Sequence, residues 1–203
     1  MKGAHSKIAC VILAAGESER FEGVKQLARI KGMPMLQHSL NAANGSGADY
    51  VLLVIGSSST EILSAIDLGR AQVVLNKNYK RGVSTSVKVG IANMPQDCKG
   101  AIIMVADQPF LKSFHLNRMM KVFRLKNSEV VILSHKGEPR SPVLISSKLF
   151  HKLVELKGDT GARQVLRKSK DIELVEISDD NVFFDIDTRR EYTEMNRIVK
   201  ERK

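Results

Sequence analysis

The sequence predicts an α/β fold built around a mainly parallel β-sheet. Short apolar runs alternate with amphipathic stretches along almost the whole chain, which is the pattern of strands joined by helices. The 203 residues are enough for one ordinary domain, and we expect a single domain over residues 1–203. No window holds eighteen consecutive apolar residues, so we expect no membrane-spanning helix and no membrane partner.

The apolar runs predict the strands in chain order. Because ligands of parallel sheets bind beyond the carboxyl ends of the strands, the residues that follow each run are the first candidates for a site. The predicted strands are Ile8–Ala15, Tyr50–Ile55, Ala71–Leu75, Gly100–Ala106, Val130–Leu133, Pro142–Ile145, Ile172–Ile177 and Val182–Asp185.

The stretches between these runs predict the helices. Pro34 suits the start of a helix over Met35–Ala43, Ser59 and Thr60 can cap Glu61–Asp67, and Ser84 can open a helix that runs through Ala92. The remaining predicted helices are Phe114–Leu125, Ser147–Leu156, Gly161–Arg167 and Thr188–Lys203. The polar segment His135–Ser141 is expected to be an internal loop between a nucleotide-side half and a later half.

The net charge and the cysteine content restrict the classes of binding partner and the cellular compartment that we expect. The excess of 32 Lys and Arg over 22 Asp and Glu favours anionic partners, namely nucleotides, phosphorylated metabolites or nucleic acid. With no Trp and 5% aromatic residues, stacking platforms for single strands are scarce, so we expect no nucleic-acid partner. Cys10 and Cys98 build no disulfide framework, and Met1–Ser6 has no signal-peptide character, so we expect a cytoplasmic protein.

The segment after the first strand is the first candidate phosphate site. Leu13, Ala14, Ala15 and Gly16 end the strand in small residues that let a ligand approach the backbone, and Ser18, Arg20 and Lys25 follow. Backbone N–H groups of such a turn can form an anion nest, and the two cations can bind phosphate oxygens. The segment matches neither common phosphate loop, and a tight turn with a charged solvent face remains the alternative.

Two further segments follow predicted strands. Asn76, Gly82, Ser84 and Ser86 surround a predicted helix start, where hydroxyls and free N–H groups can hold an anion or a base edge, or simply cap the helix. Asp107 follows Gly100–Ala106, where a carboxylate is costly to bury unless it is paired or binds a cation. Mg²⁺ suits that position, since it takes one or two carboxylates with substrate phosphates, whereas a helix-capping role is the alternative.

The later half contains two more candidate groups. Gly158 and Asp159 form a turn before Arg163, an arginine that is misplaced at a helix start unless an anion joins it. Asp185 and Asp187 end the last predicted strand on either side of one turn. Both groups are compatible with binding a phosphorylated, cation-associated ligand.

Five of these segments, in this order, resemble the MobA-like NTP transferase family, and most of all its molybdenum cofactor cytidylyltransferase branch. The similar stretches span residues 8 to 192: L-A-A-G-x-S-x-R with K-Q-L, N-K-N-Y-K-R-G-V-S-T-S, A-D-Q-P, G-D-T-G-A-R and D-I-D-T. Glu22, Val83 and Ala106 depart from the residues usual there, and the Arg140-Ser141-Pro142 segment is shortened and lacks a His.

The resemblance implies a three-layer α/β/α Rossmann-like nucleotidyltransferase fold and transfer of CMP from CTP to molybdopterin, with release of pyrophosphate. It implies that residues 13–16 and Ser18 cradle the nucleotide, that Asn76, Gly82, Ser84 and Ser86 lie near its base and ribose, and that Arg20 and Lys25 neutralise its triphosphate.

In the same family pattern Asp107 and Asp185 hold Mg²⁺ with Asp187 beside them, and Asp107 is catalytic together with Arg20 and Lys25. Gly158, Asp159, Arg163 and Arg140 belong to the acceptor side, roughly residues 135–185. Transient docking to a molybdoenzyme is a further implied partner. A sugar phosphate or another small phosphate as acceptor, or a basic nucleic-acid-binding or regulatory module, are the alternatives.

Overall fold

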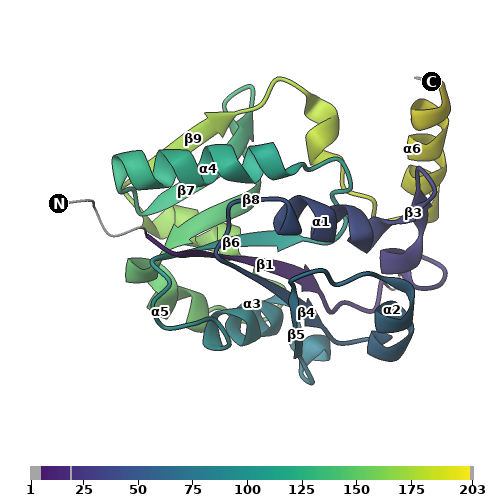
Figure 1. Cartoon of the computed structure of the whole chain (residues 1–203), viewed down its shortest axis with the longest axis horizontal. Helices are drawn as coiled ribbons and strands as arrows, with labels where there is room; N and C mark the ends of the chain where they lie inside the picture. Colours follow the sequence, from purple (N-terminus) through teal and green to yellow (C-terminus); the bar gives the residue numbers. More distant parts are fainter. Residues whose placement is uncertain (1–5, 19, 202–203) are drawn as a thin grey trace.

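The computed structural model describes residues 6–18 and 20–201, and seven strands in it form one sheet (Figure 1). The strand order is β5-β4-β1-β6-β8-β7-β9, and β8 alone runs antiparallel to both of its neighbours, so the sheet is mainly parallel, as predicted. The strands of this sheet are β1 (Ile8–Ala14), β4 (Tyr50–Ile55), β5 (Gln72–Leu75), β6 (Gly100–Val105), β7 (Val130–His135), β8 (Glu138–Ser146) and β9 (Ile172–Glu176).

Helices cover both faces of the sheet. The α-helices are α1 (Met35–Asn44), α2 (Ser59–Ala65), α3 (Val83–Ala92), α4 (Ser113–Lys126), α5 (Phe150–Val154) and α6 (Arg189–Glu201). The 3-10 helices are η1 (Lys25–Leu27), η2 (Tyr79–Arg81), η3 (Ser147–Leu149), η4 (Ala162–Lys168) and η5 (Asp180–Phe183). None of the helices in the described part of the chain is long and apolar enough to cross a membrane.

The central strand β1 supplies side chains to two cores. Its fully buried residues alternate between one core under α1 and α4 and a second core under α3 and α5, because successive side chains of a strand point to opposite faces (Figure 1). Gly90 lets α3 lie close to this strand, since a Cβ at Gly90 would come 2.5 Å from a methyl group of Val11. The result is the three-layer α/β/α architecture that the sequence predicts.

The amino terminus of α3 is bound by a loop from the later half of the chain. The amide of Ser84 donates to the carbonyl of Gly158 at 3.1 Å, and the amide of Val83 donates to the Asp159 carboxylate at 3.4 Å. Gly82 permits this contact, because its φ is +99° and a Cβ there would come 2.2 Å from the carbonyl carbon of Gly158. Two otherwise unpaired helix N–H groups are thereby satisfied.

Two sequence predictions of local structure are wrong, and one small hairpin was not predicted. The expected loop His135–Ser141 is a hairpin in which Lys136 and Gly137, at φ of 51° and 78°, join β7 to β8. Glu176 stabilises this turn by accepting both of its amides. Val182–Asp185 is no strand: Asp180–Phe183 is the 3-10 helix η5, capped by Asp179. A small hairpin of β2 (Arg29–Ile30) and β3 (Met33–Pro34) was not expected at all.

A satellite core joins the C-terminal helix α6 to the loop after β1. Phe21, Ile30 and Met35 from the first fifty residues pack there with Ile186 and Met195. The Tyr192 ring meets Phe21 edge-on at a centroid distance of 5.8 Å, and its hydroxyl donates to the Arg29 carbonyl at 3.0 Å. Residues more than 160 positions apart are therefore fixed beside one another.

The burial of His115 predicts that the stability of the folded chain depends on pH. Its Nδ1 accepts from the Lys112 amide at 2.9 Å, and burial lowers its pKa to about 4, with the charge of Arg118 adding to the effect. As the pH falls, His115 takes up a proton in the unfolded chain before it does so in the folded chain. The contribution of His115 to the stability of the fold is therefore complete above pH 6.5 and is lost as the pH falls towards 4. This shift in the pKa of His115 corresponds to a change of at most roughly 3 kcal/mol in the free energy of unfolding.

Glutamine at position 115 can accept the same amide without titrating. We therefore expect the melting temperature of His115→Gln to fall by less than that of the wild type when the pH is lowered from 7.5 to 5.0. Differential scanning fluorimetry of both proteins at the two pH values tests this. Equal losses would contradict the role of His115.

Candidate active site

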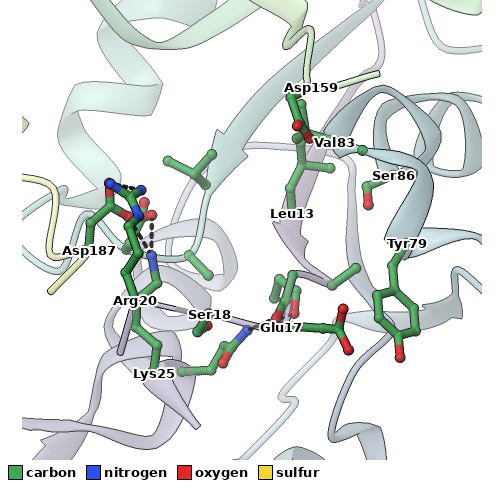
Figure 2. Close-up of a pocket in the computed structure, with 18 of the residues that line it drawn as sticks. Leu13, Glu17, Ser18, Arg20, Lys25, Tyr79, Val83, Ser86, Asp159 and Asp187 are labelled. Carbon is green, nitrogen blue, oxygen red and sulfur yellow. Dashed lines mark hydrogen bonds and ion pairs between the residues drawn. The ribbon is translucent and has the colours of Figure 1, made fainter. Parts of the chain in front are cut away.

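A cavity of about 540 Å³ opens beyond the carboxyl ends of β1 and β6 (Figure 2). Its size is within the range of about 300–1,000 Å³ that is typical of small-molecule sites. The predicted residues that line it are Leu13, Ala14, Ala15, Gly16, Ser18, Arg20, Lys25, Gly82, Ser86, Asp107, Asp159 and Asp187. The structure thus brings together segments from both halves of the chain.

The loop after β1 is held by a side chain that sequence reasoning did not single out. The amide of Gln26 donates to the carbonyls of Ala14 and Gly16, each at 3.1 Å, and Gln26 itself is 5% exposed. The left-handed turn falls on Ser18, at φ 59°, rather than on Gly16. A Cβ at Gly16 would meet no atom within 4 Å, so this glycine leaves open space along the cavity wall.

Lys25 lies between two carboxylates. Its ammonium is 2.8 Å from Oδ2 of Asp107 and 2.9 Å from Oδ1 of Asp187, and Arg20 contacts the other oxygen of Asp187 at 3.2 Å (Figure 2). Burial alone would lower the pKa of Lys25, but the charges and hydrogen bonds of the two aspartates outweigh it, so the pKa is raised. Lys25 is therefore a fixed positive charge at neutral pH.

The same contacts set the charge of Asp187. Burial would raise its pKa, whereas the hydrogen bonds and charges of Lys25 and Arg20 lower it, and the net shift is downward. Asp187 therefore stays ionised over the physiological pH range.

Asp185 is arranged differently from its neighbour. It does not line the cavity, and its Oδ1 accepts from the side-chain amide of Gln108 at 2.8 Å. Burial of the carboxyl group, and then the charge of Asp107, raise its pKa to about 6, although much of the residue's surface stays in contact with solvent. The negative charge of Asp107 makes a second negative charge on Asp185 costly unless a cation joins them.

The acidic residues fit a divalent cation that is partly coordinated by a ligand. Oδ1 of Asp107 is buried and has no hydrogen-bond partner, which is costly for a carboxylate oxygen. Within residues 6–18 and 20–201, no three His, Cys, Asp or Glu side chains are gathered into a ready metal cluster. The unpartnered oxygen suits a divalent cation that is held by one or two carboxylates together with phosphates and water.

The opposite wall of the cavity is formed by α3 and η2. Tyr79, Val83 and Ser86 lie there, across from the charged group of Arg20, Lys25 and Asp187 (Figure 2). Tyr79 and Val83 were not among the predicted site residues, although both belong to the quoted segment. The cavity therefore has one end at which Lys25 meets two aspartates, and another end at which Tyr79, Val83 and Ser86 lie near Asp159 and the Lys80–Glu17 ion pair.

Asn76 and Ser84 lie behind this wall and not in it. Asn76 is fully buried and donates to the hydroxyls of Thr85 and Ser86, each at 2.9 Å. Ser84 is 1% exposed, and its amide is taken by Gly158. Both residues support this wall from behind, and neither lines the cavity.

A second cavity of about 520 Å³ adjoins the first and shares Leu13, Val83 and Val105 with it. Arg163 and Arg167 line it above apolar side chains of β6 and β8. Arg163 lies in η4 and donates to the Pro139 carbonyl at 2.9 Å.

Of the other predicted acceptor residues, only Asp159 lines either of these two cavities, and it lines the first. Gly158 lies behind Asp159 against Gly82, and Arg140 is exposed and lines neither cavity.

Comparisons with known proteins identify the family of the chain. The family model described as "MobA-like NTP transferase domain" matches residues 10–173. The purine catabolism protein PucB of Bacillus subtilis is 30% identical over 202 residues, covering 93% of this chain and 96% of PucB. The bifunctional protein GlmU of Mycolicibacterium gilvum is 29% identical over 137 residues, and the match spans only 28% of its length.

Solved structures show the same fold. Rv0371c of Mycobacterium tuberculosis superposes with a TM-score of 0.85 at 25% identity, covering 96% of this chain and 100% of that one. A structure of Rv0371c in complex with manganese gives a TM-score of 0.81 at 23% identity, covering 94% of this chain and 98% of that one.

Proposed function

The chain belongs to the MobA-like NTP transferase family, and from this premise we propose that it transfers CMP from CTP to the phosphate of molybdopterin. One observation carries the proposal: Lys25, Asp107 and Asp187 meet at the strand ends of a cavity whose other wall can hold a nucleoside. In the proposed reaction an acceptor phosphate oxygen attacks the α-phosphorus, the bond to the β-phosphate breaks, and pyrophosphate leaves.

The side chains around Lys25 are suited to stabilise this transfer electrostatically. Lys25 and Arg20 supply positive charge for the triphosphate, and the N–H groups of the Gly16–Ser18 loop are available to its oxygens. The acceptor phosphate, with a second pKa near 6, is already anionic at neutral pH and needs no strong protein base. Catalysis of this kind is mostly positioning and charge neutralisation.

Asp107 and Asp187, with Asp185 beside them, are the residues that would hold Mg²⁺. When bound, the cation supplies charge neutralisation at the phosphates. The unpartnered Oδ1 of Asp107 supports this assignment, and so does the manganese found with the similar protein Rv0371c. Asp187 rather than Asp185 is the better second ligand, because it faces the cavity.

The second cavity is the proposed acceptor site. It opens into the first beside Leu13 and Val83, and it combines an apolar floor with the guanidinium groups of Arg163 and Arg167. A flat ring system that carries a phosphate suits such a surface. Arg140 contributes to neither cavity, so a sugar phosphate or another small phosphate as acceptor remains the alternative.

Ligand-dependent stabilisation tests the nucleotide. The cytosine assignment rests on the resemblance to the cytidylyltransferase branch, whose L-A-A-G stretch includes Ala15 here. We expect CTP with Mg²⁺ to raise the melting temperature by several degrees, and GTP, ATP or UTP to raise it less. A ligand at about a hundred times its dissociation constant adds about 2.7 kcal/mol. A larger shift with GTP would overturn the base assignment.

Pyrophosphate release tests the reaction itself. We expect release from CTP and Mg²⁺ only when molybdopterin is added, and none with sugar phosphates. Release with a sugar phosphate alone would establish the alternative acceptor. If no nucleotide binds and the chain instead binds any polynucleotide with a steep salt dependence, the nucleic-acid-binding alternative holds.

A further inference from the structure

Asp187 lies on a segment that belongs to no strand or helix. It follows η5 and directly precedes the helix-capping residue Thr188. Two of its main-chain amides make hydrogen bonds that fix this segment: the amide of Ile186 donates to the main-chain carbonyl of Asp107 at 3.3 Å, and the amide of Asp187 donates to the side-chain Oε2 of Glu191 at 2.8 Å. The first bond links the segment to the end of β6, and the second links it to α6.

Glu191 accepts more hydrogen bonds than a residue at this position of a helix cap normally does. Its Oε2 also accepts the amide of Thr188 at 2.8 Å and the hydroxyl of Thr188 at 3.0 Å, while the amide of Glu191 donates back to that hydroxyl at 3.2 Å. The Thr188–Glu191 pair is thus a capping box. The additional bond to Asp187 extends this box to the residue whose carboxylate contacts Lys25 and Arg20.

The same helical turn also contacts the opposite side of the charged group. The guanidinium of Arg189 lies 5.0 Å from the centre of the Phe21 ring and 5.8 Å from that of Tyr192. Phe21 directly follows Arg20 in the chain. The first turn of α6 therefore contacts both segments, Arg20–Phe21 and Ile186–Asp187, whose charged side chains meet at the cavity.

From these contacts we propose that Glu191 is a positioning residue: it holds the Asp187 carboxylate at the spacing from Asp107 that the cation and Lys25 require. Glu191 does not line the cavity, so it acts only through Asp187. The inference rests on the proposed function for its catalytic consequence, but the metal affinity that it predicts can be measured without turnover.

The test uses three full-length variants. Glu191→Ala removes the acceptor of the Asp187 amide. Glu191→Gln retains a side-chain oxygen that can accept it, because glutamine also serves at this position of a capping box. His115→Ala is the matched control, since His115 occupies the equivalent position in the first turn of α4, accepts the Lys112 amide there, and lines neither cavity.

We expect Glu191→Ala to weaken Mn²⁺ binding in the presence of CTP by about 10- to 100-fold, the usual effect of removing a group that orients a metal ligand. The free Mn²⁺ signal in electron paramagnetic resonance measures this. Glu191→Gln is expected within about threefold of the wild type. The melting temperature of His115→Ala is expected to fall by about as much as that of Glu191→Ala, while its Mn²⁺ affinity is unchanged.

In turnover, Glu191→Ala is expected to lower kcat by a similar factor while the KM for CTP changes little, since the nucleotide walls are intact. Unchanged Mn²⁺ affinity in Glu191→Ala would overturn the inference, and so would an equal loss in His115→Ala or a loss in Glu191→Gln as large as in Glu191→Ala. A wild type that binds Mn²⁺ but transfers no nucleotide would refute the proposed function alone, because the metal measurements still decide the role of Glu191.

Discussion

Asp107→Asn is expected to lower the rate of nucleotidyl transfer by on the order of 10³-fold or more, because one neutral preorganised donor is already worth about 10²–10³ and this change removes a full charge. Asp107 lies two residues beyond the end of the central strand β6, its Oδ2 contacts Lys25 at 2.8 Å, and its Oδ1 has no hydrogen-bond partner. Asparagine has the same shape but cannot neutralise a divalent cation.

The fold is expected to tolerate this substitution. Lys25 keeps its second contact, to Asp187, and a poorly solvated negative charge is removed, so the melting temperature without metal should stay within a few degrees of the wild type. Asp180→Asn is the matched control, because it makes the same chemical change at an exposed residue that lines neither cavity. Pyrophosphate release from CTP at saturating Mg²⁺ measures both variants. Near-normal turnover in Asp107→Asn would refute the metal assignment.

Lys25→Met is expected to lower kcat by on the order of 10²-fold or more, since it removes a preorganised positive charge from the site of the triphosphate. It also leaves Asp107 and Asp187 without the ammonium that lies between them. Two carboxylates that share one site repel each other, so the metal-free variant should melt at a lower temperature than the wild type at neutral pH.

A divalent cation should restore much of that lost stability, because it can replace the missing positive charge. Lys80→Met is the matched control: Lys80 also lines the cavity, but it pairs with Glu17 at 3.3 Å and contacts neither aspartate. The measurements are kcat and the melting temperature with and without Mg²⁺. If Lys25→Met and Lys80→Met had the same kcat and the same melting temperatures, the prediction that the charge of Lys25 stabilises the reaction would be wrong.

The sequence was sufficient for the layers of the fold and for most of the residues that line the cavity. Uninterrupted apolar runs such as Ile8–Ala15 are buried on both faces and can hardly be anything but central strands. Because such strands are parallel, the residues that follow β1 and β6 had to meet at one edge of the sheet. The position of Lys25 next to Asp107 is a consequence of that topology.

Short or exposed segments were not predictable in the same way. The run Val182–Asp185 is too brief for its periodicity to separate a strand from a helical turn, and the structure forms η5 there. The segment Lys136–Gly137 is only a two-residue turn, yet the polar strand ends around it suggested a longer loop. Hydrophobic patterning carries no information where both faces of a strand are exposed.

The roles of individual polar residues depend on long-range contacts that no local pattern encodes. The sequence does not show that the side chain of Asn76 is buried and donates hydrogen bonds to the hydroxyls of Thr85 and Ser86. Asp187, rather than Asp185, faces the cavity because Glu191 and Ile186 fix the turn between them. Gln26 gave no signal beyond its place next to Lys25, although it holds the loop after β1.

The contact of Gly82 with Gly158 has a consequence for how such enzymes can diversify. The loop that leads to the proposed acceptor arginines also supplies the hydrogen-bond acceptors for the first turn of α3, which forms a wall of the proposed nucleotide cavity. We therefore expect a change in the length or backbone path of that loop to displace this wall of the cavity as well. If the two cavities bind the acceptor and the nucleotide as proposed, selection for a new acceptor will also change nucleotide affinity, and laboratory evolution of one specificity has to screen for the other.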